Sequence, residues 1–155
     1  GGEVWVNRGG TDWTVAGHTL PPHGFYARVP GKSGTVEAAV ERLSGHVVEW
    51  SRSVDNLYVN GRGHDISFDA VHTAGAFHLT RATTGMELTP LPDSGDFALT
   101  LNPERLPWKQ AALSEASAFG EGGARLGATP LATSARGITL NCAKGIFRYR
   151  LGARP

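Results

Sequence analysis

The sequence predicts an all-β protein built as an antiparallel β-sandwich, of the immunoglobulin-like or jelly-roll-like kind. Short runs in which apolar and polar residues alternate follow one another along the chain, and each is bounded by Gly, Pro, Asn, Asp or Ser. This pattern is typical of half-buried strands joined by turns. The 155 residues include 21 glycines and 9 prolines, spread between the runs rather than gathered in a tail. Many turns joining many strands are therefore expected.

The first series of strands lies before residue 61. Alternating runs predict strands at residues 4–7, 13–16, 24–29, 36–42, 47–51 and 57–60. The segment 35–45 has apolar residues both at helical spacing and in alternation, so periodicity alone does not decide between helix and strand. We expect a strand, because a turn at Ser44-Gly45 followed by alternating residues 47–50 completes a hairpin.

A second series of strands begins after the interruption at residues 61–65. It comprises residues 66–68, 76–81, 86–89, 97–101, 111–119, 124–131, 138–142 and 146–151. Hairpin turns are expected at 83–85, 121–123 and 143–145, because their glycines accept the positive φ of a tight turn. Residues 107–113 could instead open a helical turn, with proline in its first turn.

The two series suggest two β units, a first at residues 1–72 and a second, immunoglobulin-like unit at residues 73–155. No fixed-period repeat and no low-complexity linker is visible between them. The units are therefore expected to pack together or to form a single continuous sandwich. Gly1-Gly2 lead directly into the first predicted strand, so we expect the chain to be a piece of a longer protein.

Composition argues against several classes of partner. The formal net charge is +1, and no run of like charges is long enough to form a basic stripe, so nucleic acid is not an expected partner. No stretch approaches the roughly 20 apolar residues of a membrane-spanning helix, so no membrane partner is expected. Cys142 is the only cysteine, which excludes an internal disulfide. It alternates with Ile138 and Leu140, which indicates a buried thiol rather than a reactive one.

Aromatic side chains are the first candidates for ligand binding, because sugar rings stack on flat aromatic faces while amides and charged groups bind the hydroxyls. Four of them are predicted to lie away from the core, in loops or on the solvent side of strands: Trp5, Tyr26, Tyr58 and Trp108. The candidates for hydrogen bonds to the sugar are Arg28, Glu49, Asn60 and Arg62, of which Arg28 lies beside Tyr26 and Asn60 beside Tyr58. Trp13 and Trp50 alternate with valines and are predicted to lie in the core. The competing interpretation is that most of these aromatics fill the core or a seam with a neighbouring domain.

Metal and catalytic signals are weak. The only local cluster of potential ligands is His64, Asp65, Asp69 and His72, and alternation spreads such spacings over both faces of a strand. Calcium remains open as a cofactor if Asp65, Asp69, Asp93 and Asp96 converge from loops, although no calcium-loop pattern is present. No pair of carboxylates is singled out for glycoside hydrolysis, and no Gly-x-Ser-x-Gly motif occurs. The sequence therefore assigns no catalytic residue.

Three segments carry a resemblance: Glu-Val-Trp-Val-Asn at residues 3–7, Asp-Trp-Thr-Val at 12–15 and Leu-Pro-Pro-His-Gly-Phe at 20–25. With them the chain resembles the β-sandwich accessory regions that follow the catalytic barrel in multidomain glycoside hydrolases. Residues 73–155 resemble the later immunoglobulin-like unit and end in the strand 147–151. The resemblance implies an extracellular or periplasmic bacterial protein, an adjacent catalytic domain on the same polypeptide, and no catalysis by this chain.

Two functions follow from the resemblance and the aromatics. The chain is expected to be a non-catalytic module that binds a polysaccharide or oligosaccharide, or else a structural module that packs against a catalytic domain and stabilises it. An independent small hydrolase is a third alternative. A structural module would expose an apolar patch of several hundred Å² when alone, and this separates the first two hypotheses. Asn60-Gly61 also favours a simple turn over a binding site.

Overall fold

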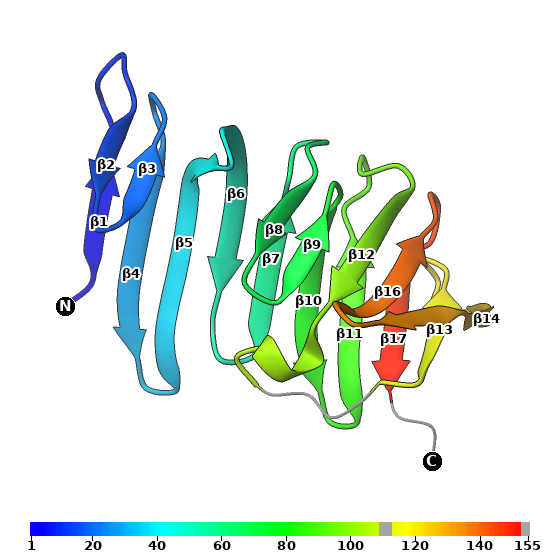
Figure 1. The fold of residues 1–155 in the computed structure, drawn as a ribbon. Coiled ribbons are helices and arrows are strands. Elements are labelled where there is room, and N and C mark those ends of the chain that lie inside the picture. Colours follow the sequence, from blue (N-terminus) through cyan, green and yellow to red (C-terminus); the bar gives the residue numbers. More distant parts are fainter. Residues whose placement is uncertain (109–112, 153–155) are drawn as a thin grey trace.

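The computed structural model describes residues 1–108 and 113–152, and Figure 1 shows that their regular secondary structure is almost entirely β-strand. Seventeen strands and one 3₁₀ helix, η1 (Pro103–Arg105), are present in these residues. The strands are β1 (Glu3–Val6), β2 (Trp13–Val15), β3 (His18–Leu20), β4 (Phe25–Gly31), β5 (Gly34–Leu43), β6 (His46–Arg52), β7 (Asn56–Asn60), β8 (Ile66–Phe68), β9 (Val71–Thr73), β10 (Ala76–Ala82), β11 (Gly85–Pro90), β12 (Phe97–Leu101), β13 (Glu115–Phe119), β14 (Arg125–Thr129), β15 (Leu131–Ser134), β16 (Gly137–Cys142) and β17 (Arg148–Gly152).

The strands form a long main sheet with two smaller sheets on one of its faces (Figure 1). The main sheet has ten strands in the order β1-β4-β5-β6-β7-β10-β11-β17-β13-β14. A five-stranded smaller sheet, β15-β16-β12-β9-β8, covers its second half, and a two-stranded ribbon, β2-β3, covers its first strands. The pairings are antiparallel, as in the hairpin of β5 with β6. The prediction of an all-β antiparallel sandwich is confirmed.

The core lies between the main sheet and the smaller sheet. Side chains along a strand point alternately to its two sides, so every second side chain faces this layer. In β7 the side chains are accordingly half-buried and buried in turn. The almost fully buried side chains include Leu57, Phe77 and Leu79 from the main sheet and Leu99, Leu101 and Leu140 from the smaller sheet. Burying each such side chain contributes about 1.5–3 kcal/mol, so this layer holds the two sheets together.

Local turn chemistry predicted several hairpins correctly. The ambiguous segment 35–45 is a strand, β5, and the turn after it has Ser44 at φ 50° and Gly45 at φ 85°. The turns at 83–85 and 121–123 join paired strands, as expected. The turn at 143–145 was expected to be a hairpin and is not, because β16 belongs to the smaller sheet and β17 to the main sheet.

The structure differs from the sequence-based prediction at several strands, and one predicted segment lies largely outside the described residues. The predicted strand 124–131 is two strands, β14 and β15, because the chain passes from one sheet to the other at Pro130. Three short strands, β3, β9 and β15, were not predicted as separate elements. The helical turn expected at 107–113 falls largely on residues 109–112, which lie outside the described residues. β7 and β10 lie on either side of the predicted boundary at residue 72, and they pair within the main sheet. The division into two units stays a prediction.

Candidate functional site

Tyr26 and Trp5 lie on the covered side of the main sheet, beneath the ribbon. The two rings are cross-strand neighbours and stack with centroids 5.4 Å apart, while the His18 ring from the ribbon stacks on Tyr26 at 3.8 Å. Tyr26 is consequently only 5% exposed and Trp5 is half-buried. The expectation that Tyr26 is a solvent-side platform is wrong, because the ribbon covers its ring. Burial and a hydrogen bond donated to Glu37 at 2.7 Å raise the pKa of the Tyr26 phenol to about 12.

Charged residues continue this network toward the smaller sheet. Arg52 lies 2.7 Å from Glu37 and also pairs with Asp69, which connects β6 to the β8–β9 turn. Arg28, a candidate for sugar binding, lies 3.9 Å from the same carboxylate and is exposed. Burial alone would raise the pKa of Glu37. Hydrogen bonds from Tyr26 and Arg52, together with the positive charges of Arg52 and Arg28, lower it by more, so the pKa lies below its usual value. These groups therefore hold strands together.

Glu41 is a buried carboxylate that the sequence did not single out. It is 4% exposed and accepts a hydrogen bond from the Trp50 indole at 2.6 Å, while His18 Nδ1 lies 2.8 Å from its second oxygen. The pair joins the ribbon to β5 and β6. Trp50 is 3% exposed, so its predicted place in the core is confirmed. Its burial could have been inferred from alternation, because Glu41 lies two residues after Ala39 and so on the same, covered side of β5.

Four of the eight candidate residues meet on the opposite side of the main sheet. The Tyr58 hydroxyl donates to Glu49 at 3.2 Å, and Arg62 Nε donates to the same carboxylate at 3.1 Å. Asn60 is directly opposite Glu49 in the β6–β7 ladder, and its side-chain oxygen accepts from the Arg62 backbone N–H at 2.9 Å. Asn60 thus stabilises the turn after β7, as the Asn-Gly sequence favours. We call these four residues the polar cluster.

Trp108 and Trp13 are placed differently from the expectations. Trp108 is 9% exposed, so the idea that it projects from a loop is wrong, and no hydrogen-bond partner of its indole N–H occurs among the described residues. Trp13 is 41% exposed although alternation with Val15 suggested a core position. The reason is that β3 packs on the main sheet whereas β2 is the outer strand of the ribbon. Alternation therefore correctly placed Trp13 and Val15 on one face of β2, but no described element covers that face completely.

The uncovered side of the main sheet carries an apolar face. Cross-strand neighbours on this side are Val4 with Ala27 and Ala38, Val6 with Phe25 and Val40, and Val29 with Val36. Four of the valines are strongly exposed: Val4 at 63%, Val6 at 47%, Val29 at 48% and Val36 at 47%. We call the eight residues of these three rows the apolar face. It borders the polar cluster, because Val40 is directly opposite Glu49.

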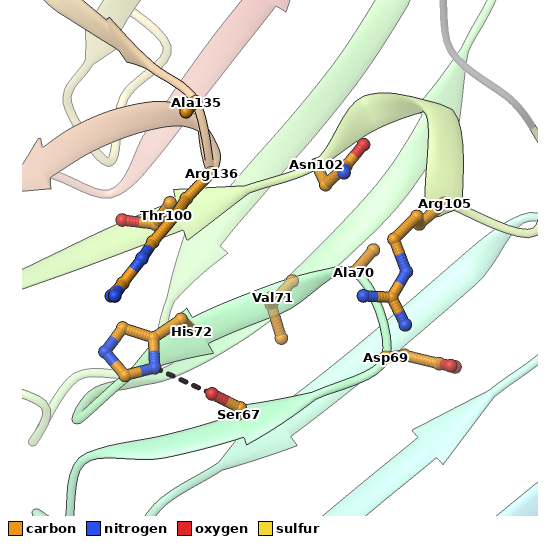
Figure 2. A pocket seen from close by; sticks show the side chains of 10 residues that line it. All are labelled: Ser67, Asp69, Ala70, Val71, His72, Thr100, Asn102, Arg105, Ala135 and Arg136. Carbon is orange, nitrogen blue, oxygen red and sulfur yellow. Dashed lines mark hydrogen bonds between the residues drawn. The ribbon is translucent and has the colours of Figure 1, made fainter.

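A pocket of about 490 Å³ lies on the outer side of the smaller sheet (Figure 2). Its floor contains a polar cross-strand row, in which Ser67, His72 and Thr100 are neighbours on β8, β9 and β12. Ser67 Oγ is 2.9 Å from His72 Nδ1, and Thr100 is hydrogen-bonded to Thr139 at 2.9 Å. Its complete lining is Ser67, Asp69, Ala70, Val71, His72, Thr100, Asn102, Arg105, Ala135 and Arg136. The pocket is therefore polar, and its lining contains no Phe, Tyr or Trp.

Ser67 and His72 in this pocket are not held rigidly enough to act as a catalytic nucleophile and its general base. Asp65 lies 3.2 Å from His72 Nε2, which gives a Ser–His–Asp chain, but the Asp65 and His72 side chains are 69% and 42% exposed. Water competes for both groups, and a nucleophile–base pair needs an orienting group held rigidly in place. The arrangement supplies hydrogen-bonding groups for a ligand.

The carboxylates considered for calcium do not converge. Within residues 1–108 and 113–152 no group of three or more His, Cys, Asp or Glu residues is placed to hold a metal ion. Asp69 pairs with Arg52, and Asp96 accepts from the Lys144 backbone N–H at 2.6 Å. No helix in this part of the chain is long and apolar enough to cross a membrane.

Comparison of the chain with models of known families, with curated proteins and with solved structures found no match.

Proposed function

We propose that the chain is a non-catalytic β-sandwich module that packs through its apolar face against a neighbouring domain of the same polypeptide. The observation that carries this proposal is the exposure of Val4, Val6, Val29 and Val36, by 47–63%, on three adjacent strands. A contiguous exposed apolar patch on a soluble protein marks an interaction surface. Covering each half-exposed valine would contribute about 1 kcal/mol.

The two sides of β1, β4 and β5 support the same conclusion. One side holds the stacked Trp5 and Tyr26 and is covered by the ribbon, whose Leu20 is fully buried. The other side holds the apolar face, which no described element covers (Figure 1). Strands with apolar residues on both sides are typical of sheets that are covered on both sides. The apolar face thus has the composition of a surface that another domain covers.

A linked neighbouring domain fits this surface better than a second copy of the chain. The exposed area of the apolar face is on the order of a few hundred Å², whereas a stable interface between separate proteins buries about 800 Å² on each partner. A covalently linked domain is held at a high effective concentration, so a smaller contact is sufficient. The ion-paired Glu49 and Arg62 at the border resemble the polar rim of an interface. The catalytic domain implied by the glycoside hydrolase resemblance is the neighbour we propose.

The test compares Val36→Asp with Leu126→Asp, which changes a 57%-exposed leucine on β14 at the other end of the main sheet. The isolated chain should be a monomer at micromolar concentration and bind a fluorescent apolar dye, and Val36→Asp should reduce dye binding more than Leu126→Asp. In the polypeptide that carries the neighbouring domain, Val36→Asp should lower the thermal midpoint of that domain. A stable dimer of the isolated chain would instead make a second copy the occupant, and equal effects of the two variants would contradict the proposal.

Carbohydrate binding is the second candidate, favoured by the meeting of Glu49, Tyr58, Asn60 and Arg62 in the polar cluster. Tyr58 is half-buried and lies beside hydrogen-bonding groups, and a tyrosine ring is a surface on which a sugar can stack. Support is weaker than for docking, because Glu49 already accepts from Tyr58 and Arg62. Retardation of the chain in a polysaccharide-containing gel should be lost in Tyr58→Ala and kept in Arg28→Ala, which lies on the other side of the sheet. No retardation by any polysaccharide, or equal loss in both variants, would reject this candidate.

A further inference from the structure

We propose that the pocket on the smaller sheet binds the carboxylate of a sugar acid, such as a uronate. The pocket lies on the outer side of the smaller sheet, whereas the apolar face lies on the uncovered side of the main sheet. Figure 1 shows how these two sheets are layered. The two surfaces are therefore independent, and this site does not depend on the docking function.

Two guanidinium groups give the pocket its positive charge. Arg136, in the turn between β15 and β16, extends over the pocket toward His72, and Arg105 enters from η1 at the other end (Figure 2). Neither side chain has an ion pair within residues 1–108 and 113–152, and the sequences 109–112 and 153–155 contain no Asp or Glu. The one carboxylate in the lining, Asp69, is paired with Arg52. Both arginines are consequently available to an anion.

Uncharged polar groups complete the pocket. Ser67, Thr100 and Asn102 supply two hydroxyls and an amide, groups that exchange hydrogen bonds with the hydroxyls of a sugar. A volume of about 490 Å³ accommodates a small ligand of this kind. No Phe, Tyr or Trp lines the pocket, so a neutral sugar has only the small His72 imidazole on which to stack.

The absence of Phe, Tyr and Trp from the lining favours acidic over neutral ligands. Most of the affinity must then come from hydrogen bonds, and those between a guanidinium and a carboxylate are the strongest available to these residues. Arginine also binds sulfate and phosphate, so the shared chemistry is an oxyanion. The hydroxyls and the amide beside the arginines favour an oxyanion carried on a polyhydroxylated ring over a free inorganic ion.

The experiment titrates the chain with D-glucuronate, D-glucose and inorganic sulfate, and follows the backbone amide resonances of β8, β9 and β12 by NMR. D-Glucuronate should bind saturably and shift these resonances, and D-glucose should bind at least about tenfold more weakly, because it lacks the charged group. Sulfate should bind more weakly than glucuronate. Sulfate binding as tight as glucuronate would overturn the sugar-acid assignment in favour of a simple anion site.

Variants separate a built site from general attraction of anions. Arg136→Gln should weaken glucuronate binding at least about tenfold, and Thr100→Val should weaken it less. Arg125→Gln is the matched control, since Arg125 is an exposed arginine on β14 that bonds only to Ser117 among the described residues. The proposal would be overturned if glucuronate did not bind saturably, if Arg136→Gln bound it with unchanged affinity, or if Arg125→Gln lost as much affinity as Arg136→Gln. An unchanged amide spectrum outside the pocket verifies that each variant is folded.

Discussion

Replacement of Glu41 by leucine should destabilise the protein more than most single substitutions, because it breaks the buried link between the ribbon and the main sheet. Glu41 is 4% exposed and is bonded to the Trp50 indole at 2.6 Å and to His18 at 2.8 Å. Glu41→Leu removes both interactions and leaves the indole N–H buried without an acceptor. Each hydrogen bond to a charged group contributes about 1.5–3 kcal/mol, and breaking one side of a buried pair costs about 3–5 kcal/mol.

The expected loss of unfolding free energy for Glu41→Leu is therefore about 3 kcal/mol or more. Glu41→Gln keeps an oxygen for the indole and an amide beside His18, so it should cost about 1 kcal/mol. Urea denaturation followed by tryptophan fluorescence measures both. With a slope of about 2 kcal/mol per molar urea, Glu41→Leu should lower the midpoint by about 1.5 M.

The control is Glu121→Leu, which changes an exposed glutamate in the β13–β14 turn and should stay within about 0.5 kcal/mol of the parent. The reasoning would be refuted by a Glu41→Leu protein as stable as Glu121→Leu. It would also be refuted if glutamine were as damaging as leucine, because the hydrogen bonds would then not explain the loss.

Three further outcomes are expected. The depressed pKa of Glu37 means that its carboxylate contributes stability that is present above about pH 4.5 and lost as the pH falls through the folded-state pKa, so Arg52→Gln should reduce the steepness of acid unfolding followed by circular dichroism. Burial raises the pKa of the Cys142 thiol to about 12, so its modification by a disulfide reagent at mildly alkaline pH should be at least about a hundredfold slower in the folded than in the urea-unfolded chain. A Cβ on Gly75 would lie 2.2–2.6 Å from three Phe97 ring atoms, so Gly75→Ala should cost about 1–3 kcal/mol in urea denaturation, and a neutral result would show that the ring moves freely.

The sequence predicted the strands well where local chemistry decides them. The β5–β6 and β10–β11 hairpins follow from alternation and from glycine in the turn, as at Gly45 and Gly85 with φ of 85° and 140°. The meeting of Glu49, Tyr58 and Asn60 is also local, since β6 and β7 are consecutive strands. The hairpins depend on residues that are close in the chain, which is why a single sequence predicts them, whereas the meeting of these three side chains was not itself predicted.

Alternation could not reveal which side of a strand is covered. In β5 the apolar Val36, Ala38 and Val40 lie on the uncovered side, while the buried Glu41 faces the ribbon. The burial of Tyr26 likewise depends on the ribbon, whose separate strand β3 was not predicted. A side chain therefore changes from an exposed platform to a core residue because of an element distant from its own strand.

The pocket could not be predicted from the sequence because its parts come together by long-range pairing. His72 on β9 lies opposite Thr100 on β12, and the turn that carries Arg136 arrives through β16, which pairs with β12. Nothing in the alternation of β9 specifies β12 as its partner. The sequence marked His72 and Asp69 as potential metal ligands, and the structure instead places them in a polar pocket.

The proposal that the apolar face is covered by a neighbouring domain is tested most directly by measuring how fast a thiol on that face reacts. Cys142 is the only native cysteine and is buried, so Val36→Cys and Leu126→Cys each provide a single exposed reporter. Both should react rapidly in the isolated chain. In the polypeptide that carries the neighbouring domain, the thiol at position 36 should react at least about tenfold more slowly, corresponding to about 1.4 kcal/mol of protection, while the thiol at position 126 reacts as before. Equally fast modification at both positions in that polypeptide would contradict the proposal.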